Sequence, residues 1–91
     1  MAADELIDKR ALSKLRWRCR RGLLENDLLI ERFFGRYETT LTVLQARGLL
    51  ALMELPDNDL LDLLIARRQP EGELAGNDDA LQVLCMLRAP V

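Results

Sequence analysis

The residues of this chain that could take part in chemistry gather around one glycine, in the run Trp17-Arg18-Cys19-Arg20-Arg21-Gly22-Leu23-Leu24-Glu25. Arg21 offers a forked cationic donor and Glu25 a carboxylate acceptor, while the missing side chain of Gly22 permits close approach by a partner. This pattern favours recognition of another molecule over bond-making chemistry. A plain helix stop at Gly22, flanked by ordinary surface charges, is the alternative interpretation of the same residues.

Motifs for catalysis or metal binding are missing from the sequence. The chain has no histidine, which removes the commonest general base and the usual partner of a nucleophilic serine or cysteine. Cys19 and Cys85 lack zinc-site spacing, and Cys19 is expected to be a structural thiol on the apolar side of its helix. Asp57, Asp59 and Asp62 lack the glycine and later glutamate of a calcium loop, so helix capping explains them better. We therefore expect no catalytic residue, no metal and no cofactor of the chain's own, and no enzyme.

Composition favours a small helical protein. The 91 residues suffice for one domain, 49% of them are apolar and only 4% are aromatic, and no apolar run is long enough to cross a bilayer. The net charge is −2, but residues 1–21 hold seven of the thirteen basic residues, so a basic first helix should stand on an acidic body. The N-terminus resembles neither a signal sequence nor a transit peptide, which favours a bacterial cytoplasmic protein without membrane insertion over a mitochondrial precursor; a processed, mature chain is the alternative that would look the same.

Hydrophobic periodicity predicts an all-α fold, a small five-helix bundle forming a single domain over residues 1–91. Gly22 is placed to end the first helix. Thr42 and Gln45 fit a capping box, and Asn77 or Asp78 should cap the last helix. The expected helices cover residues 4–21, 23–37, 43–54, 58–68 and 78–87, with a loop at 69–76 and a frayed tail at 89–91.

The second helix carries a broad apolar stripe, which is typical of a central helix that touches several neighbours. The stripe consists of Leu23, Leu24, Leu28, Ile30, Phe33, Phe34 and Tyr37. The fourth helix is expected to direct Leu60, Leu61, Leu64 and Ile65 inward. Gly48 should weaken the third helix by about 1 kcal/mol relative to alanine, unless close helix packing needs the space.

Taken together, several motifs suggest a family. The run from Trp17 to Asp27 has the form Trp-x-Cys-Arg-Arg-Gly-x-x-Glu-x-Asp, and it is followed by Phe33-Phe34 and by Asp-Leu-Leu-x-x-Leu at 59–64. In these motifs, and in length, the chain resembles the succinate dehydrogenase FAD assembly factor family, the small flavinylation factors of bacteria and mitochondria. The resemblance covers nearly the whole chain up to the loop at 69–76. Its core, Arg-Gly-x-x-Glu, is short, and the surrounding residues make it fairly specific.

The resemblance implies a five-helix bundle and a function that composition could not show. Members bind the flavoprotein subunit of succinate dehydrogenase, and often that of fumarate reductase, and promote covalent attachment of FAD to a histidine of that subunit. The FAD would thus belong to the client. The chain departs from the family at Leu23-Leu24 and in the loop after Pro70, which leaves the contacts made there open. The implied partner-binding residues are Arg21, Gly22 and Glu25 of the motif and its neighbours Trp17, Arg20 and Asp27.

A second class of function is compatible with the sequence. Arginines and an aromatic ring together can bind phosphate and stack on a base, as in a small nucleic-acid-binding regulator that uses the basic first helix. The acidic pI of about 5.1 and the lack of a binding-module signature weigh against it. Such binding would weaken steeply with salt and would not depend on Glu25. The residues concerned are Lys14, Arg16, Trp17, Arg18, Arg20 and Arg21.

Overall fold

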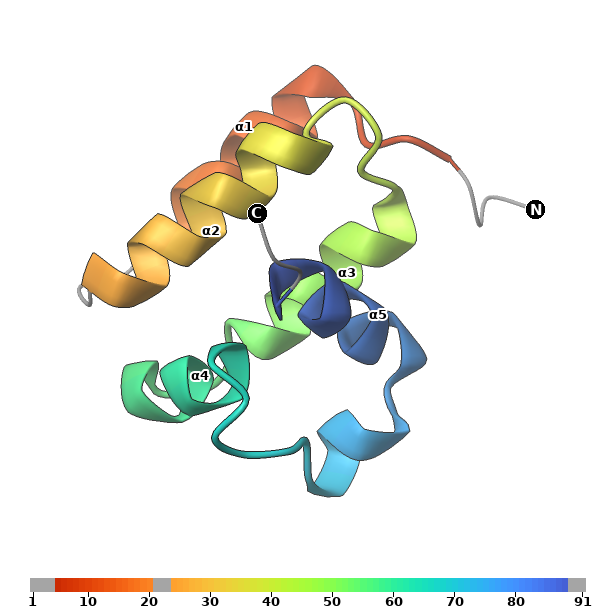
Figure 1. Cartoon of the computed structure of the whole chain (residues 1–91). Helices are drawn as coiled ribbons and strands as arrows, with labels where there is room; N and C mark the ends of the chain where they lie inside the picture. The colour runs from red at the N-terminus through yellow and green to blue at the C-terminus, as the bar shows by residue number, and fades with distance from the viewer. Residues whose placement is uncertain (1–4, 21–23, 89–91) are drawn as a thin grey trace.

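The computed structural model describes residues 5–20 and 24–88. Arg21, Gly22, Leu23 of the expected apolar stripe, and the tail expected at 89–91 lie outside the described residues. Within them the predicted all-α fold with five α-helices is confirmed (Figure 1). No helix of this part of the chain is long and apolar enough to cross a membrane. The elements are α1 (Lys9–Arg18), α2 (Leu24–Tyr37), α3 (Val43–Leu52), α4 (Asp57–Leu64), the 3-10 helix η1 (Gly72–Gly76) and α5 (Asp78–Arg88).

The first helix begins later than the sequence predicts. Residues 5–7 pair instead with the segment that precedes α3, where the Ile7 N–H donates to the Leu41 carbonyl at 3.0 Å. Asp8 then caps α1, because its carboxylate accepts the Ala11 N–H at 2.7 Å. The expected helix start near residue 4 is therefore wrong, since backbone pairing with a distant segment holds this stretch outside the helix.

α1 also ends three residues before its expected end. The Arg20 N–H donates to the Trp17 carbonyl at 3.2 Å, which is the tightened pattern that closes many helix ends. Cys19, at the C-cap, donates its N–H to the Leu15 carbonyl, and its side chain is fully buried. The expected structural thiol is thus confirmed, and Cys19 and Leu15 anchor the end of α1 in the core.

α2 contacts both α4 and α5, as expected for a helix with several neighbours, but α5, which contacts α2, α3, α4 and η1, is the more central helix of the described residues. Ile30, Phe33 and Phe34 are buried as predicted. Leu24 and Leu28 are 66% and 62% exposed, so their expected place in the buried stripe is wrong. The buried residues recur every three or four positions along one side of the helix, and the two leucines project from the opposite side.

α3 and α5 begin at caps that the sequence predicts. The Thr42 hydroxyl accepts the Gln45 N–H at 3.1 Å and the Gln45 side chain accepts the Thr42 N–H at 3.0 Å, which completes the capping box. Asn77 caps α5 by accepting the Ala80 N–H at 3.1 Å. α3 ends at Leu52, two residues earlier than expected. Local side-chain hydrogen bonds therefore fix where both helices start.

The packing of α3 on α5 depends on Gly48. Gly48 is buried, and a Cβ atom at this position would overlap the Asp79 carbonyl group and come within 2.8 Å of the Ala80 nitrogen. Close helix packing thus needs the space that glycine leaves. This packing accounts for a glycine in the interior of a helix.

α4 ends four residues earlier than expected, at Leu64. Ala66 has a φ of 63°, and the Arg67 N–H turns back to donate to the Asp62 carbonyl at 2.8 Å. This geometry is a Schellman motif, which usually carries glycine at the left-handed position, so the sequence contained no visible stop signal. Ile65 is 47% exposed because it follows the last helical turn, and its predicted inward orientation is wrong.

Two further boundaries around α4 differ from expectation. Pro56 occupies the N-cap without a side-chain cap, so the helix begins at Asp57 rather than at Asn58. The segment 69–76, expected as a loop, contains η1. Proline fits directly before a helix because it has no N–H to leave unpaired.

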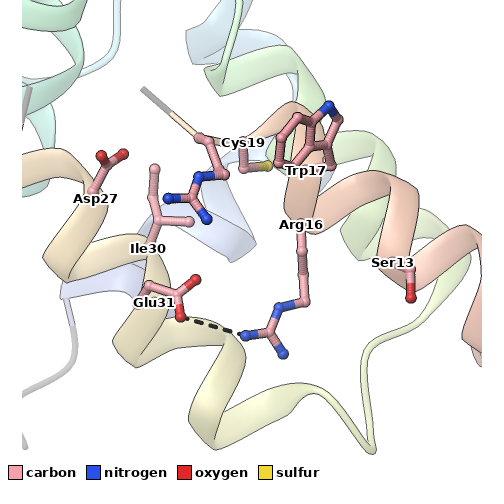
Figure 2. A pocket seen from close by; sticks show the side chains of 8 residues that line it. Ser13, Arg16, Trp17, Cys19, Asp27, Ile30 and Glu31 are labelled. Carbon is pink, nitrogen blue, oxygen red and sulfur yellow. Dashed lines mark hydrogen bonds and ion pairs between the residues drawn. The ribbon is translucent and has the colours of Figure 1, made fainter. Parts of the chain in front are cut away.

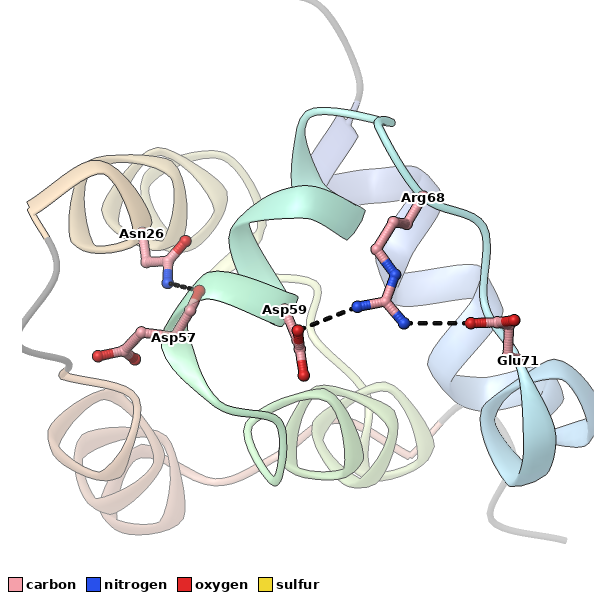
Figure 3. A network of polar contacts seen from close by, with 5 residues as sticks. All are labelled: Asn26, Asp57, Asp59, Arg68 and Glu71. Carbon is pink, nitrogen blue, oxygen red and sulfur yellow. Dashed lines mark hydrogen bonds and ion pairs between the residues drawn. The ribbon is translucent and has the colours of Figure 1, made fainter.

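Polar contacts tie the end of α4 and the following loop to the rest of the molecule (Figure 3). The Arg68 guanidinium donates to Asp59 at 3.0 Å and to Glu71 at 3.1 Å. The hydrogen bond to Glu71, aided by the charge of Asp59, raises the pKa of Arg68 above its ordinary value. Arg88 of α5 donates Nε to the Leu63 carbonyl at 2.7 Å, which satisfies a carbonyl near the helix end.

Candidate functional site

α1 and α2 enclose a groove of about 630 Å³, and side chains from both helices face it (Figure 2). Three predicted partner-binding residues, Trp17, Arg20 and Asp27, come together here although they belong to different elements. The floor includes the apolar side chain of Ile30, whereas the walls are mostly polar. The groove is lined by Ser13, Arg16, Trp17, Cys19, Arg20, Asp27, Ile30 and Glu31.

Trp17 stands at the groove with 74% of its surface exposed. The guanidinium carbon of Arg20 lies 5.8 Å from the Trp17 ring centroid, within the range of a cation–π interaction. Arg20 forms no ion pair with any carboxylate of the described residues. An indole and a cation left at the surface together form a recognition element for an apolar group that carries negative charge.

Arg16 joins the two helices that form the groove. Its guanidinium donates to Glu38 at 2.9 Å and to Glu31 at 3.3 Å, and it lies 5.3 Å from the Phe34 ring centroid. Each ion pair is exposed and contributes at most about 1 kcal/mol. Together they hold the side chain of Arg16 across the groove and thereby fix its width. Arg16 is accordingly a structural part of the site.

Glu25 does not line the groove. It is exposed on α2, two residues before Asp27, which is half-buried and lines the groove. Because a helix turns by about 100° per residue, side chains two positions apart project from different sides. The two predicted partner-binding acids therefore lie on different sides of α2, while Arg21 and Gly22 are among the residues that the structure does not describe.

Asn26, between these two acids, was not predicted from the sequence. Its side chain is fully buried, and Nδ2 donates to the Asp57 carbonyl at 3.0 Å (Figure 3). Its Oδ1 has no hydrogen-bond partner among the described residues. The spacing of Asn26, Ile30 and Phe33 along one helix face is the signal that could have identified it as buried. Asn26 thus attaches the first turn of α2 to the start of α4.

The side chains that line the groove are of types that can recognise another molecule. The described residues contain no group of three or more cysteine, aspartate or glutamate side chains that could hold a metal ion. The thiol of Cys19 is buried, and the chain has no histidine to activate it. What the groove offers is an indole, guanidinium groups and carboxylates on two rigid helices, which can orient a bound protein surface.

Comparisons with known proteins show a family. A family model described as "flavinator of succinate dehydrogenase" matches residues 13–88. The FAD assembly factor SdhE of Ralstonia nicotianae is 55% identical over 82 residues, covering 90% of this chain and 85% of that protein. FAD assembly factors SdhE of Coxiella burnetii (41% identity, 68% of this chain and 76% of that protein) and Legionella pneumophila (38%, 75% and 86%) are also similar. No solved structure gives a significant match.

Proposed function

The chain belongs to the family of flavinators of succinate dehydrogenase, and from this premise we propose that it binds the flavoprotein subunit of succinate dehydrogenase and promotes the covalent attachment of FAD to it. The observation that carries the proposal is the family match over residues 13–88, which includes the Arg-Gly-x-x-Glu motif at Arg21, Gly22 and Glu25. The flavoprotein of fumarate reductase is a second client that this function would accommodate. An assembly factor of this kind acts where its client is made, in the bacterial cytoplasm.

In this proposal the chain acts by holding its client, not as an enzyme. The groove residues bind and orient a protein surface, so the factor favours the client conformation in which FAD and its acceptor side chain are aligned. Orientation alone can contribute several kcal/mol, up to about 7–11 kcal/mol in the best intramolecular cases. The flavin chemistry remains with the client and its FAD. The factor would thus need no cofactor of its own.

The partner-binding surface combines the motif with the groove. Glu25 lies on one side of α2 and Asp27 on another, with Trp17 and Arg20 across the groove from Asp27. A client that contacts all of them must reach over the N-terminal half of α2. The proposed surface consists of Arg21, Gly22, Glu25, Trp17, Arg20 and Asp27.

The structure supports nucleic-acid binding less well than the sequence alone does. Arg16 is paired with Glu31 and Glu38, so one cation of the basic helix is already neutralised. Two carboxylates, those of Asp27 and Glu31, line the same groove, so it is not the uniformly basic surface that favours phosphate groups. We therefore propose a protein partner, and neither nucleic acid nor a membrane.

The function is tested by flavinylation of the client. The purified protein is incubated with the apo form of the succinate dehydrogenase flavoprotein subunit and FAD, and covalent flavin is measured by its fluorescence in a denaturing gel. We expect covalent flavin to rise with the wild-type chain and to return to the level without factor for Gly22→Arg and Glu25→Ala. The bulky charge of the first variant would block close approach, and the second would lose an acceptor.

Matched controls come from η1, which lies across the molecule from α1 and α2 (Figure 1). Gly76→Arg and Glu73→Ala make the same chemical changes at exposed positions, and a Cβ at Gly76 has nothing within 4 Å. Both should retain full activity. No increase in covalent flavin with the wild-type chain, together with no complex on a sizing column, would contradict the proposed function.

A further inference from the structure

Two exposed leucines form an apolar strip on the outer side of α2 that the function described so far does not use. Leu24 and Leu28 are four residues apart, so their side chains are neighbours on the helix surface. They account for two of the five large hydrophobic side chains that are exposed among the described residues. We name this pair the Leu24–Leu28 strip.

The position of the strip ties it to the proposed partner-binding surface. With about 100° of rotation per residue, the exposed arc of α2 runs from Asp27 through Leu24 and Leu28 to Glu25. A partner cannot reach the other side of α2, because that side holds the buried residues that face the core. A partner that contacts both acids must therefore cover the strip.

The size and charge of the surface point to the same conclusion. A stable protein–protein complex buries about 800 Å² of accessible surface on each partner. This area is a substantial part of the 5961 Å² that the small chain exposes. An interface of that size usually involves about 20–30 residues on each side, which is more than the motif and groove residues provide, and the strip is the exposed apolar surface next to them. Arg20, stacked on Trp17 and without an ion pair among the described residues, favours a carboxylate on the partner.

We propose that the Leu24–Leu28 strip is a docking contact for an apolar patch on the flavoprotein subunit, bordered by a carboxylate that pairs with Arg20. This inference rests on the proposed function, because it names how the same partner is held. Leucines buried at the centre of such an interface would contribute to affinity, whereas on the free protein they contribute little to stability.

The test measures the Kd between the full chain and the apo flavoprotein subunit by isothermal titration calorimetry. The double variant Leu24→Ala/Leu28→Ala should raise the Kd about tenfold or more, because alanine removes apolar surface that the partner would bury at both positions, and a tenfold change corresponds to about 1.4 kcal/mol. Its thermal unfolding midpoint should match the wild type, since alanine is a strong helix former and both sites are exposed. Arg20→Gln should weaken binding at low salt, and added salt should shrink this loss.

The double variant Leu6→Ala/Ile65→Ala is the control, because it removes two exposed apolar side chains away from α2. Its Kd should stay within about twofold of the wild type, as expected for surface positions outside an interface. A wild-type chain that binds, with an unchanged Kd for the strip variant, overturns this inference and leaves the proposed function intact. The inference is also overturned if the free chain forms a concentration-dependent dimer that the strip variant abolishes, because the strip would then bind a second copy of the chain. A wild-type chain that does not bind overturns both.

Discussion

Among the described residues, Ala66 is the non-glycine residue whose backbone conformation is the least favourable in free energy. It has a φ of 63°, which is the left-handed region that L-residues with a side chain rarely adopt. Its N–H donates to the Leu63 carbonyl at 3.2 Å, and the next N–H reaches back to Asp62, so the conformation closes the end of α4. The left-handed form costs an L-residue about 1–2 kcal/mol relative to the ordinary helical form.

Ala66→Gly should therefore stabilise the protein. Glycine removes the steric cost at this φ, and it returns part of that gain through the greater conformational entropy of the unfolded chain. We expect a net increase of about 1 kcal/mol in the free energy of unfolding, measured by chemical denaturation. Ala75→Gly, within η1 and without a positive φ, is the control and should not stabilise. A destabilised Ala66→Gly variant would show that the Schellman geometry is wrong.

At the scale of elements, the contact between α3 and α5 is set by a glycine. Gly48→Ala should lower the free energy of unfolding by up to about 2 kcal/mol, because an overlap with backbone atoms puts the overpacking cost at the upper end of about 1–3 kcal/mol, whereas the gain in helix propensity is about 1 kcal/mol. Gly35→Ala makes the same change inside α2 at an exposed position with nothing within 4 Å, and it should stabilise instead. Equal effects of the two substitutions would rule out close α3–α5 packing as the reason for Gly48.

Element boundaries could be predicted where local side chains set them. Thr42 and Asn77 cap their helices through hydrogen bonds to residues three positions away, which is information that a short window of sequence contains. The start of α1 depends on backbone pairing with a segment more than thirty residues later, as in the Ile7–Leu41 hydrogen bond. The end of α4 depends on an alanine in a conformation that glycine usually takes. No short window of sequence reveals either.

The candidate site was predictable in part, for a similar reason. The sequence motif predicted Trp17, Arg20 and Asp27 as partner-binding residues, and the fold places these three side chains around one groove. Helical periodicity suggested that Leu24 and Leu28 were core residues, because it reports that residues share a face but not which faces are covered. The burial of Asn26 was not predicted, because buried asparagines are uncommon and its hydrogen-bond partner is a backbone carbonyl on another helix.

Across the whole molecule, Asn26 links α2, one of the two helices that line the groove, to α4. α2 contacts α4 and α5, and the hydrogen bond from Asn26 to the Asp57 carbonyl fixes the first turn of α2 on the first turn of α4. Glu25 and Asp27, the acids on either side of Asn26 that we propose to bind the partner, belong to the turn of α2 that this contact holds. A change at Asn26 should therefore alter the stability of the assembled molecule in a way that depends on ionisation.

Asn26→Asp should make folding stability fall as pH rises. A carboxyl group at this fully buried position has its pKa raised by desolvation and by the neighbouring acids, above the value of about 3.9 in the unfolded chain. The helix N-terminus opposes this shift, but it is worth only about 0.3–1 kcal/mol at most surface sites, whereas an unpaired buried charge costs about 3–5 kcal/mol. The raised folded pKa means that stability is fully present below pH 4, where the protonated carboxyl can still donate to the Asp57 carbonyl. Stability should then be lost at about 1.4 kcal/mol per pH unit up to the folded pKa.

The measurement is the difference in the free energy of unfolding between variant and wild type across pH 3–8, in which the titration of all other groups cancels. Asn26→Leu is the control, because it removes the same hydrogen bond with a side chain of similar size that does not ionise. Its deficit should be constant with pH. A pH-independent deficit for Asn26→Asp as well would mean that the carboxylate reaches water, and that the first turn of α2 separates from α4 readily. In that case the hydrogen bond of Asn26 would not hold the groove in a fixed position against α4. The flavoprotein partner would then have to fix the position of α2 when it binds.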